Sequence, residues 1–320
     1  MAATYAFIEQ DLQFAATNLP ASWDPKFISR TTRGAANGIL AKVYLTQHKW
    51  AEAMNAANAV MTSGQYDLST PYTKIFSEEG ENGKESVLEI QGTASSTEST
   101  ANGIQYANIQ GVRGSGTFDM GWGWNTPSTQ LEAAYEAGDP RKDRTILYTA
   151  AGSKSLYGED IPTGLPNPRY NNKVYTNPTY RSLYNSRMGY WMNVRILRYA
   201  DVVLMYAEAA NEVGGAQNIA SAVTALNSVR ARARNGNAAI LPDVVTTDQA
   251  IAREAIRHER RIELAMEHDR FFDLVRWGIS QDAMTAAGKP NFSAGRDNLL
   301  PIPQAQIDLS KGILTQNPGY

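Results

Sequence analysis

The residues best suited to acid or base chemistry lie in the most charged stretch of the chain, residues 259–278. Three carboxylates recur there at every fourth position, namely Glu259, Glu263 and Glu267. Glycoside hydrolysis needs two carboxylates that face each other across a bond, whereas these three share one side of a helix. The arginines within helical pairing distance are Arg260, Arg261 and Arg270. The spacing therefore predicts structural ion pairs, and a hydrolase is the weaker interpretation.

The histidines give no metal-binding pattern. His48 is remote from the other two, and His258 and His268 lie nearly three helical turns apart with no HExxH spacing. The glycines of residues 111–123 match neither GxGxxG nor GxxxxGK[ST], and the chain has no GxSxG motif. We therefore expect no metal, no cofactor and no catalytic residue.

Asp139-Pro140-Arg141 is a further candidate for a structural role. Proline fixes the backbone, and arginine can hold a carboxylate through two hydrogen bonds. The tripeptide predicts a turn that leads into a helix, or a buried ion pair.

Aromatic and amide side chains form the strongest candidate binding site. The sequence GWGWN at residues 121–125 places two tryptophans beside an amide, with glycines that leave room for the rings. A sugar presents C–H groups that pack on an aromatic face and hydroxyls that bind amides. The predicted ligand-binding residues are Asn102, Tyr106, Trp122, Trp124 and Asn125. If both tryptophans were buried, the platform would be sought among Tyr148, Tyr157, Tyr175 and Tyr180.

Composition limits the class of protein. The chain has 320 residues, 30 Lys and Arg against 32 Asp and Glu, and no cysteine. A net charge of -2 gives no basic field for nucleic acid, so no nucleic-acid partner is expected. Disulfides and thiolate metal sites are excluded. No stretch approaches the roughly 18 apolar residues of a membrane helix.

Apolar periodicity predicts a mostly helical fold. Helices are expected from about residue 5 to 19, over 34–47 and 49–63, over an amphipathic 199–213, over 219–234, and over a long charged segment from about 251 to 272. Small and aromatic residues in 34–63 suit a tetratricopeptide-like hairpin, and 199–234 suggests another. Residues 86–91 alternate like a brief strand, and the prolines of 299–303 favour an extended segment.

The chain divides into three predicted parts that form one intertwined unit. Residues 1–77 hold the first helices, residues 78–193 form a loop-rich region in which ligand binding is expected, and residues 194–320 return to helices with an extended tail.

Four segments together resemble the RagB/SusD family of outer-membrane nutrient-binding lipoproteins. They are ERRIELAMEHDRFFDLVRWG at 259–278, RILRYADVVLMYAEAANE at 195–212, GDPRKDRTIL at 138–147 and the ending NLLPIPQAQIDLSKGILTQNPGY. The resemblance covers essentially the whole chain but only the later part of the family pattern. It implies a tetratricopeptide-like fold, no catalysis and no obligatory cofactor.

The resemblance also implies a place and partners. It implies a cell-surface protein that binds a glycan or another nutrient and delivers it to a SusC-like TonB-dependent transporter of the outer membrane. Contact with the membrane would be only through a lipid anchor, which is absent from this chain. We expect the reading frame to continue upstream into a signal peptide and a lipidated cysteine.

One alternative comes from another class of protein. A tetratricopeptide scaffold would bind a peptide and no sugar. Exposed rings on a loop-built surface favour the glycan, whereas exposed apolar residues along the helical hairpins favour a peptide.

Overall fold

The computed structural model describes residues 1–94 and 104–320, and its amino end consists of three helices. They are α1 (Ala2–Asn18), α2 (Arg33–Thr46) and α3 (Trp50–Met61), as the apolar periodicity predicts. Thr32 begins α2, because its side-chain oxygen accepts a hydrogen bond from the N–H of Ala35 at 3.2 Å. Ala41, Ala53 and Ala57 are fully buried. These small side chains let α2 and α3 pack closely as a hairpin.

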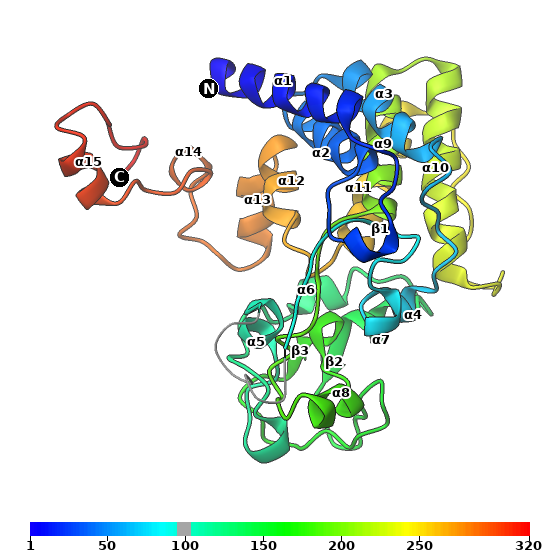
Figure 1. Cartoon of the computed structure of the whole chain (residues 1–320), viewed down its shortest axis with the longest axis vertical. Coiled ribbons are helices and arrows are strands. Elements are labelled where there is room, and N and C mark those ends of the chain that lie inside the picture. The colour runs from blue at the N-terminus through cyan, green and yellow to red at the C-terminus, as the bar shows by residue number, and fades with distance from the viewer. Residues whose placement is uncertain (95–103) are drawn as a thin grey trace. The chain divides into compact units, whose positions relative to one another are not determined.

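The second hairpin consists of α9 (Tyr199–Val213) and α10 (Ala216–Arg234), and α11 (Gln249–Glu263) packs on α9. Helix α9 is central, since it contacts α2, α3, α10 and α11 (Figure 1). Its predicted amphipathic character is therefore wrong. Asp201 and Glu208 are buried, and Asp201 binds Lys42 at 3.0 Å and Arg260 at 2.8 Å. Partners from other helices replace solvent on the polar side.

The long charged helix predicted over 251–272 is also wrong. Helix α11 ends at Glu263, and Met266 and His268 adopt left-handed conformations with φ of 69° and 74°. A residue with a side chain in this conformation interrupts a right-handed helix. The expected apolar side is incorrect as well, because Ile251 is 59% exposed while Glu259 and Glu263 are buried.

Short elements replace long helices in the loop-rich region. Its helices are α5 (Tyr106–Gln110), α6 (Thr129–Glu132), α7 (Arg141–Thr145) and α8 (Pro178–Leu183), and α4 (Tyr72–Ile75) comes just before it. Single 3-10 turns, including one before α2, are η1 (Pro25–Phe27), η2 (Glu78–Gly80), η3 (Gly116–Phe118) and η4 (Asn172–Val174). A small core beneath them contains Val112, Met120, Leu147, Tyr170 and Tyr175.

Two antiparallel strand pairs connect distant segments. Strand β1 (Ser86–Ile90), which the sequence predicts, pairs with β4 (Val194–Arg198). Strand β2 (Ile146–Tyr148) pairs with β3 (Arg169–Asn171). The β1–β4 pair leads the chain into the loop-rich region and back from it to α9 (Figure 1). The mostly helical fold with a loop-rich insertion is confirmed.

The described residues form two units, residues 1–266 and 267–320. The second unit contains α12 (Arg270–Arg276), α13 (Ser280–Ala286), α14 (Ala294–Asp297) and α15 (Gln304–Leu309). Residues 299–303 have no regular structure, as their prolines predict. Ile302 and Gln316 hold the tail together through two hydrogen bonds of 2.7 and 2.9 Å. Among the described residues, no helix has both the length and the apolar character to span a membrane.

Candidate functional site

The loop of residues 121–125 presents two tryptophan rings to solvent. Trp122 is 58% exposed and Trp124 is 62% exposed, although each is a large apolar side chain. Their ring centroids lie 6.2 Å apart, and the ring planes are inclined by 50°. We call this pair of rings, together with Asn125, the aromatic platform.

Backbone hydrogen bonds fix the aromatic platform on α5 and the residue after it. The N–H groups of Trp122 and Trp124 donate to the carbonyls of Asn108 and Ile109 at 3.0 and 3.1 Å. The N–H of Gly123 donates to the carbonyl of Gly111 at 2.9 Å. The two indoles are therefore held by a rigid backbone, and their exposure is not the result of a loose loop.

Glycine is required at two positions of this loop. A Cβ on Gly121 would lie 2.0 Å from the carbonyl oxygen of Asn108, which no side chain can tolerate without a shift. Gly123 has φ of +69°, and a Cβ there would lie 2.9 Å from the Cβ of Arg113. The glycines thus allow the loop to approach α5 closely, while Trp122 between them and Trp124 after Gly123 are exposed to solvent.

An amide ladder supports the end of the platform. Asn125 has φ of +51°, a conformation that asparagine tolerates better than most residues. Its Nδ2 donates to Oε1 of Gln110 at 2.8 Å, and the same oxygen accepts from Nδ2 of Asn171 at 2.9 Å. The side chain of Asn125 is exposed, so its carbonyl oxygen remains available to a ligand.

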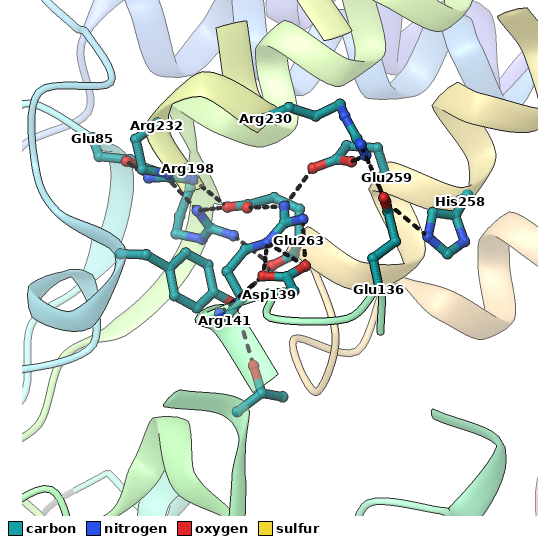
Figure 2. Close-up of polar contacts among 12 residues, drawn as sticks. Glu85, Glu136, Asp139, Arg141, Arg198, Arg230, Arg232, His258, Glu259 and Glu263 are labelled. Carbon is teal, nitrogen blue, oxygen red and sulfur yellow. Dashed lines mark hydrogen bonds and ion pairs between the residues drawn. The ribbon is translucent and has the colours of Figure 1, made fainter. Parts of the chain in front are cut away.

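A buried charge network ties the loop-rich region to the helices. Figure 2 shows Glu263 among three guanidinium groups. Its Oε1 accepts from Arg198 at 3.0 Å and from Arg232 at 2.5 Å, and its Oε2 accepts from Arg141 at 3.1 Å. Burial raises the pKa of Glu263, but the surrounding arginines outweigh burial and hold that pKa well below its usual range.

Glu259 extends the network along α11. Its carboxylate binds Arg141 on one oxygen and Arg230 on the other, the latter at 3.1 Å. Arg230 also holds both oxygens of Glu136, at 2.7 and 3.0 Å. Beside it, Nε2 of His258 lies 3.7 Å from Glu136, and burial lowers the pKa of this histidine (Figure 2).

Arg141 is the link from the loop-rich region. Asp139 accepts from the Arg141 backbone at 3.0 Å and from its guanidinium at 2.8 Å, and α7 begins at Arg141 directly after Pro140. Both predicted roles of Asp139-Pro140-Arg141 are therefore confirmed, since the tripeptide is a helix start and a buried pair at once.

The predicted ion-pair partners of Glu259 and Glu263 are wrong. Arg260 binds Asp201, and Arg261 donates to the carbonyl of Gln130. The role of Glu259 and Glu263 as structural carboxylates is confirmed, but their partners come from α7, α10 and the start of α9. A buried carboxylate needs cations from every side, which one helix cannot supply.

Three arginines that were not among the predicted ion-pair partners complete the network. They are Arg198, Arg230 and Arg232. One signal was present, because Arg230 lies four residues after Leu226 and seven after Val223, on the apolar side of α10. A charged residue on an apolar side indicates a buried partner.

Comparison with known proteins identifies the family. The model of the SusD family matches residues 84–320, about three quarters of the chain. The chain belongs to the SusD family. It is 31% identical to SusD-like protein P2 of Formosa agariphila over 99% of this chain and 65% of that protein. The chain thus spans about two thirds of this relative.

Solved SusD-family structures share the fold. A laminarin-binding SusD-like protein superposes with a TM-score of 0.80 at 30% identity, covering 100% of this chain and 69% of that one. Surface glycan-binding protein A from Bacteroides thetaiotaomicron, solved with laminarihexaose, gives a TM-score of 0.78 at 22% identity, covering 99% of this chain and 70% of that one.

The remaining predicted site residues of this SusD-family chain have different surroundings. Tyr106 begins α5 and packs half-buried against the cluster that contains Trp191. Asn102 lies outside the described residues. Trp122, Trp124 and Asn125 are therefore the predicted residues that the structure brings together.

The four reserve tyrosines mostly serve packing. Tyr175 is buried and stacks with Tyr157, and Tyr180 stacks with Tyr184 and Trp191. Tyr148 donates to Glu132 at 2.9 Å, and its pKa is raised to about 12 by burial and by this carboxylate. These tyrosines were the alternative if both Trp122 and Trp124 were buried, and both tryptophans are exposed.

The helical hairpins of this SusD-family chain have a groove of their own. It is lined by α3, α9 and α10 and has a volume of about 580 Å³. Val203 on its floor is buried, Met61 and Tyr206 are half-buried, and Ser221, Thr224 and Ser228 line one wall. Large exposed apolar side chains, the expected sign of a peptide-binding surface, do not line this groove.

Proposed function

We propose that this SusD-family chain binds a glycan on the aromatic platform at the cell surface and delivers it to a SusC-like TonB-dependent transporter. The observation that carries the proposal is the exposure of Trp122 and Trp124 on a rigid backbone. Solvent exposure of two indoles is unfavourable unless a ligand covers them. Sugar C–H groups pack on such faces, and the adjacent Asn125 can bind hydroxyls.

The inclination of the rings constrains how a glycan would bind. Because the planes differ by 50°, one flat surface cannot lie on both rings. With the centroids 6.2 Å apart, we expect neighbouring sugar units to pack on different rings. A glycan whose sugar units rotate from one to the next suits this platform better than a flat, ribbon-like glycan.

The relatives indicate which ligand to test first. The structure that is 30% identical is described as laminarin-binding, so laminarin is the first candidate. Family membership supports the proposed surface location and the transporter partner.

Binding without catalysis is part of the proposal. Glu259 and Glu263 are the candidate carboxylates for acid or base catalysis, and both are fully buried and neutralised by arginines. A glycosidase needs two carboxylates that reach the glycosidic bond in an open cleft. Incubation with laminarin should therefore release no reducing sugar.

Calorimetric titration with laminarihexaose tests the proposal. We expect Trp122→Ala and Trp124→Ala each to weaken binding about five- to tenfold, because each substitution removes an aromatic contact that contributes about 1 kcal/mol to the binding free energy. Phe14→Ala is the matched control, since Phe14 on α1 is 70% exposed and remote in sequence from the platform. Wild-type affinity in both tryptophan variants would refute the platform as the site.

A further inference from the structure

A pocket distinct from the aromatic platform lies beside the linker between α1 and α2. Its walls come from residues 21–23, 25, 28–30 and 32, from Gln65 and Tyr66 after α3, and from residues 82–84, 86–89 and 91, which include part of β1. We call it the linker pocket. Its volume is about 430 Å³, within the range of small-ligand sites. It shares no residue with the platform, so a ligand here would be recognised independently.

Arg30 is a preorganised cation on one wall of the linker pocket. Its guanidinium carbon lies 5.1 Å from the ring centroid of Trp23 and 4.1 Å from that of Phe27. The indole is fixed in turn, because its N–H donates to the carbonyl of Thr31 at 2.9 Å. Stacking engages the faces of the guanidinium and leaves its N–H edge free. Within residues 1–94 and 104–320, that edge binds no acceptor and no carboxylate.

Lys84 is a second cation in the lining of the linker pocket. Its Nζ donates to the carbonyl of Gln65 at 3.3 Å and forms no ion pair in the described part of the chain. The carboxylate of the lining, Glu89, is buried and faces Arg195, with 3.5 Å between Oε1 and Nε. Of the side chains that line the linker pocket, Arg30 and Lys84 carry the accessible charges, and Lys84 also attracts the nearby carboxylate of Asp67.

Fixed polar groups cover the rest of the wall. Asn82 and Gln91 exchange two hydrogen bonds of 2.9 Å, one in each direction. Each amide keeps a second N–H for another acceptor. Ile28 and Leu88 add apolar contact between these amides and the cations. A ligand that carries hydroxyl groups, a C–H surface and a negative charge would find a binding partner for each of them in this pocket.

We propose that the linker pocket binds an acidic sugar, a hexuronate unit. Its planar carboxylate would accept two hydrogen bonds from Arg30 and an ion pair from Lys84, and its hydroxyls would meet Asn82 and Gln91. A carboxylate matches the fork of a stacked guanidinium in geometry as well as charge. The proposal concerns a second saccharide site and does not rest on the platform.

Titration of the full chain with sodium glucuronate, followed by calorimetry or by chemical-shift changes, tests the inference. We expect glucuronate to bind and glucose to bind at least about tenfold more weakly, since the charge-assisted hydrogen bonds are lost. Arg30→Gln and Lys84→Gln should each weaken glucuronate binding several-fold. Trp124→Ala should leave it unchanged, which separates this site from the platform.

Lys26→Gln is the matched control. Lys26 lies in the same linker, its Nζ lies 4.9 Å from the same Phe27 ring, and it does not line the pocket. Equal loss in Lys26→Gln and Arg30→Gln would show a diffuse charge effect and overturn the proposal. Equal affinity for glucose and glucuronate, or no glucuronate binding to a folded wild type, would overturn it as well.

Discussion

Arg141 on α7 binds Glu259 on α11 although 118 positions separate them, and both side chains are completely buried. This contact fixes the loop-rich region to the helical scaffold. Because α7 leads into β2, and β2–β3 packs in the small core beneath the platform loop, the network sets a rigid base for the exposed rings. The charged helix is thus a structural anchor and lies apart from the proposed ligand.

Glu263→Gln should destabilise the fold strongly. The change removes one negative charge shared by Arg141, Arg198 and Arg232, and breaking a buried pair costs about 3–5 kcal/mol. Urea unfolding measures the loss. Glu254→Gln on the same helix is the control, because that side chain is 76% exposed and 3.7 Å from Arg257, so its change should stay within about 0.5 kcal/mol. Equal effects would mean that the network contributes no stability.

The stabilising effect of Glu263 should disappear in acid. The pKa of this carboxyl is lowered in the folded protein, so its contribution is fully present above the unfolded pKa of about 4.3 and is lost as pH falls below it. The difference in unfolding free energy between wild type and Glu263→Gln should be constant from pH 7 to about 5 and shrink below about pH 4. A difference that shrinks between pH 7 and 5 would contradict this assignment.

Gly121→Ala should displace the platform. The added Cβ would lie 2.0 Å from the Asn108 carbonyl, which is also the acceptor for the N–H of Trp122. We expect a stability loss of about 1–3 kcal/mol and weaker laminarihexaose binding, measured by thermal unfolding and calorimetry. Gly295→Ala is the control, because a Cβ there meets no atom within 4 Å. Unchanged binding in folded Gly121→Ala would show that ring placement does not matter.

Asn125→Gly separates the contribution of the Asn125 side chain to ligand binding from the conformation of its backbone. Glycine accepts the left-handed conformation at φ +51°, so stability should change by less than about 1 kcal/mol while the ligand loses an amide partner. We expect laminarihexaose binding to weaken several-fold in calorimetry. Asn185→Gly is matched, since Asn185 is exposed with φ +47° in another loop, and its variant should bind like wild type.

The sequence predicted those parts of the fold that depend on local periodicity. Helices α2, α3, α9 and α10 begin and end close to the expected residues, because the apolar stripe of each lies within one segment. It also selected Trp122 and Trp124, since the glycine before each of them favours rings that stand clear of their neighbours. Their use by a ligand remains a prediction.

Tertiary structure decided what local patterns could not. Asp201 and Glu263 belong to polar sides that would face water in isolated helices, yet both are buried, because cations from distant segments surround them. Helix α11 also ends at Glu263 and leaves Ile251 59% exposed, neither of which the local apolar spacing predicted. The spacing of apolar residues in the sequence determines which side of a helix is apolar. Which charges are buried depends on partners from other elements, 31 to 122 residues away for Glu263, whose positions only the folded chain defines.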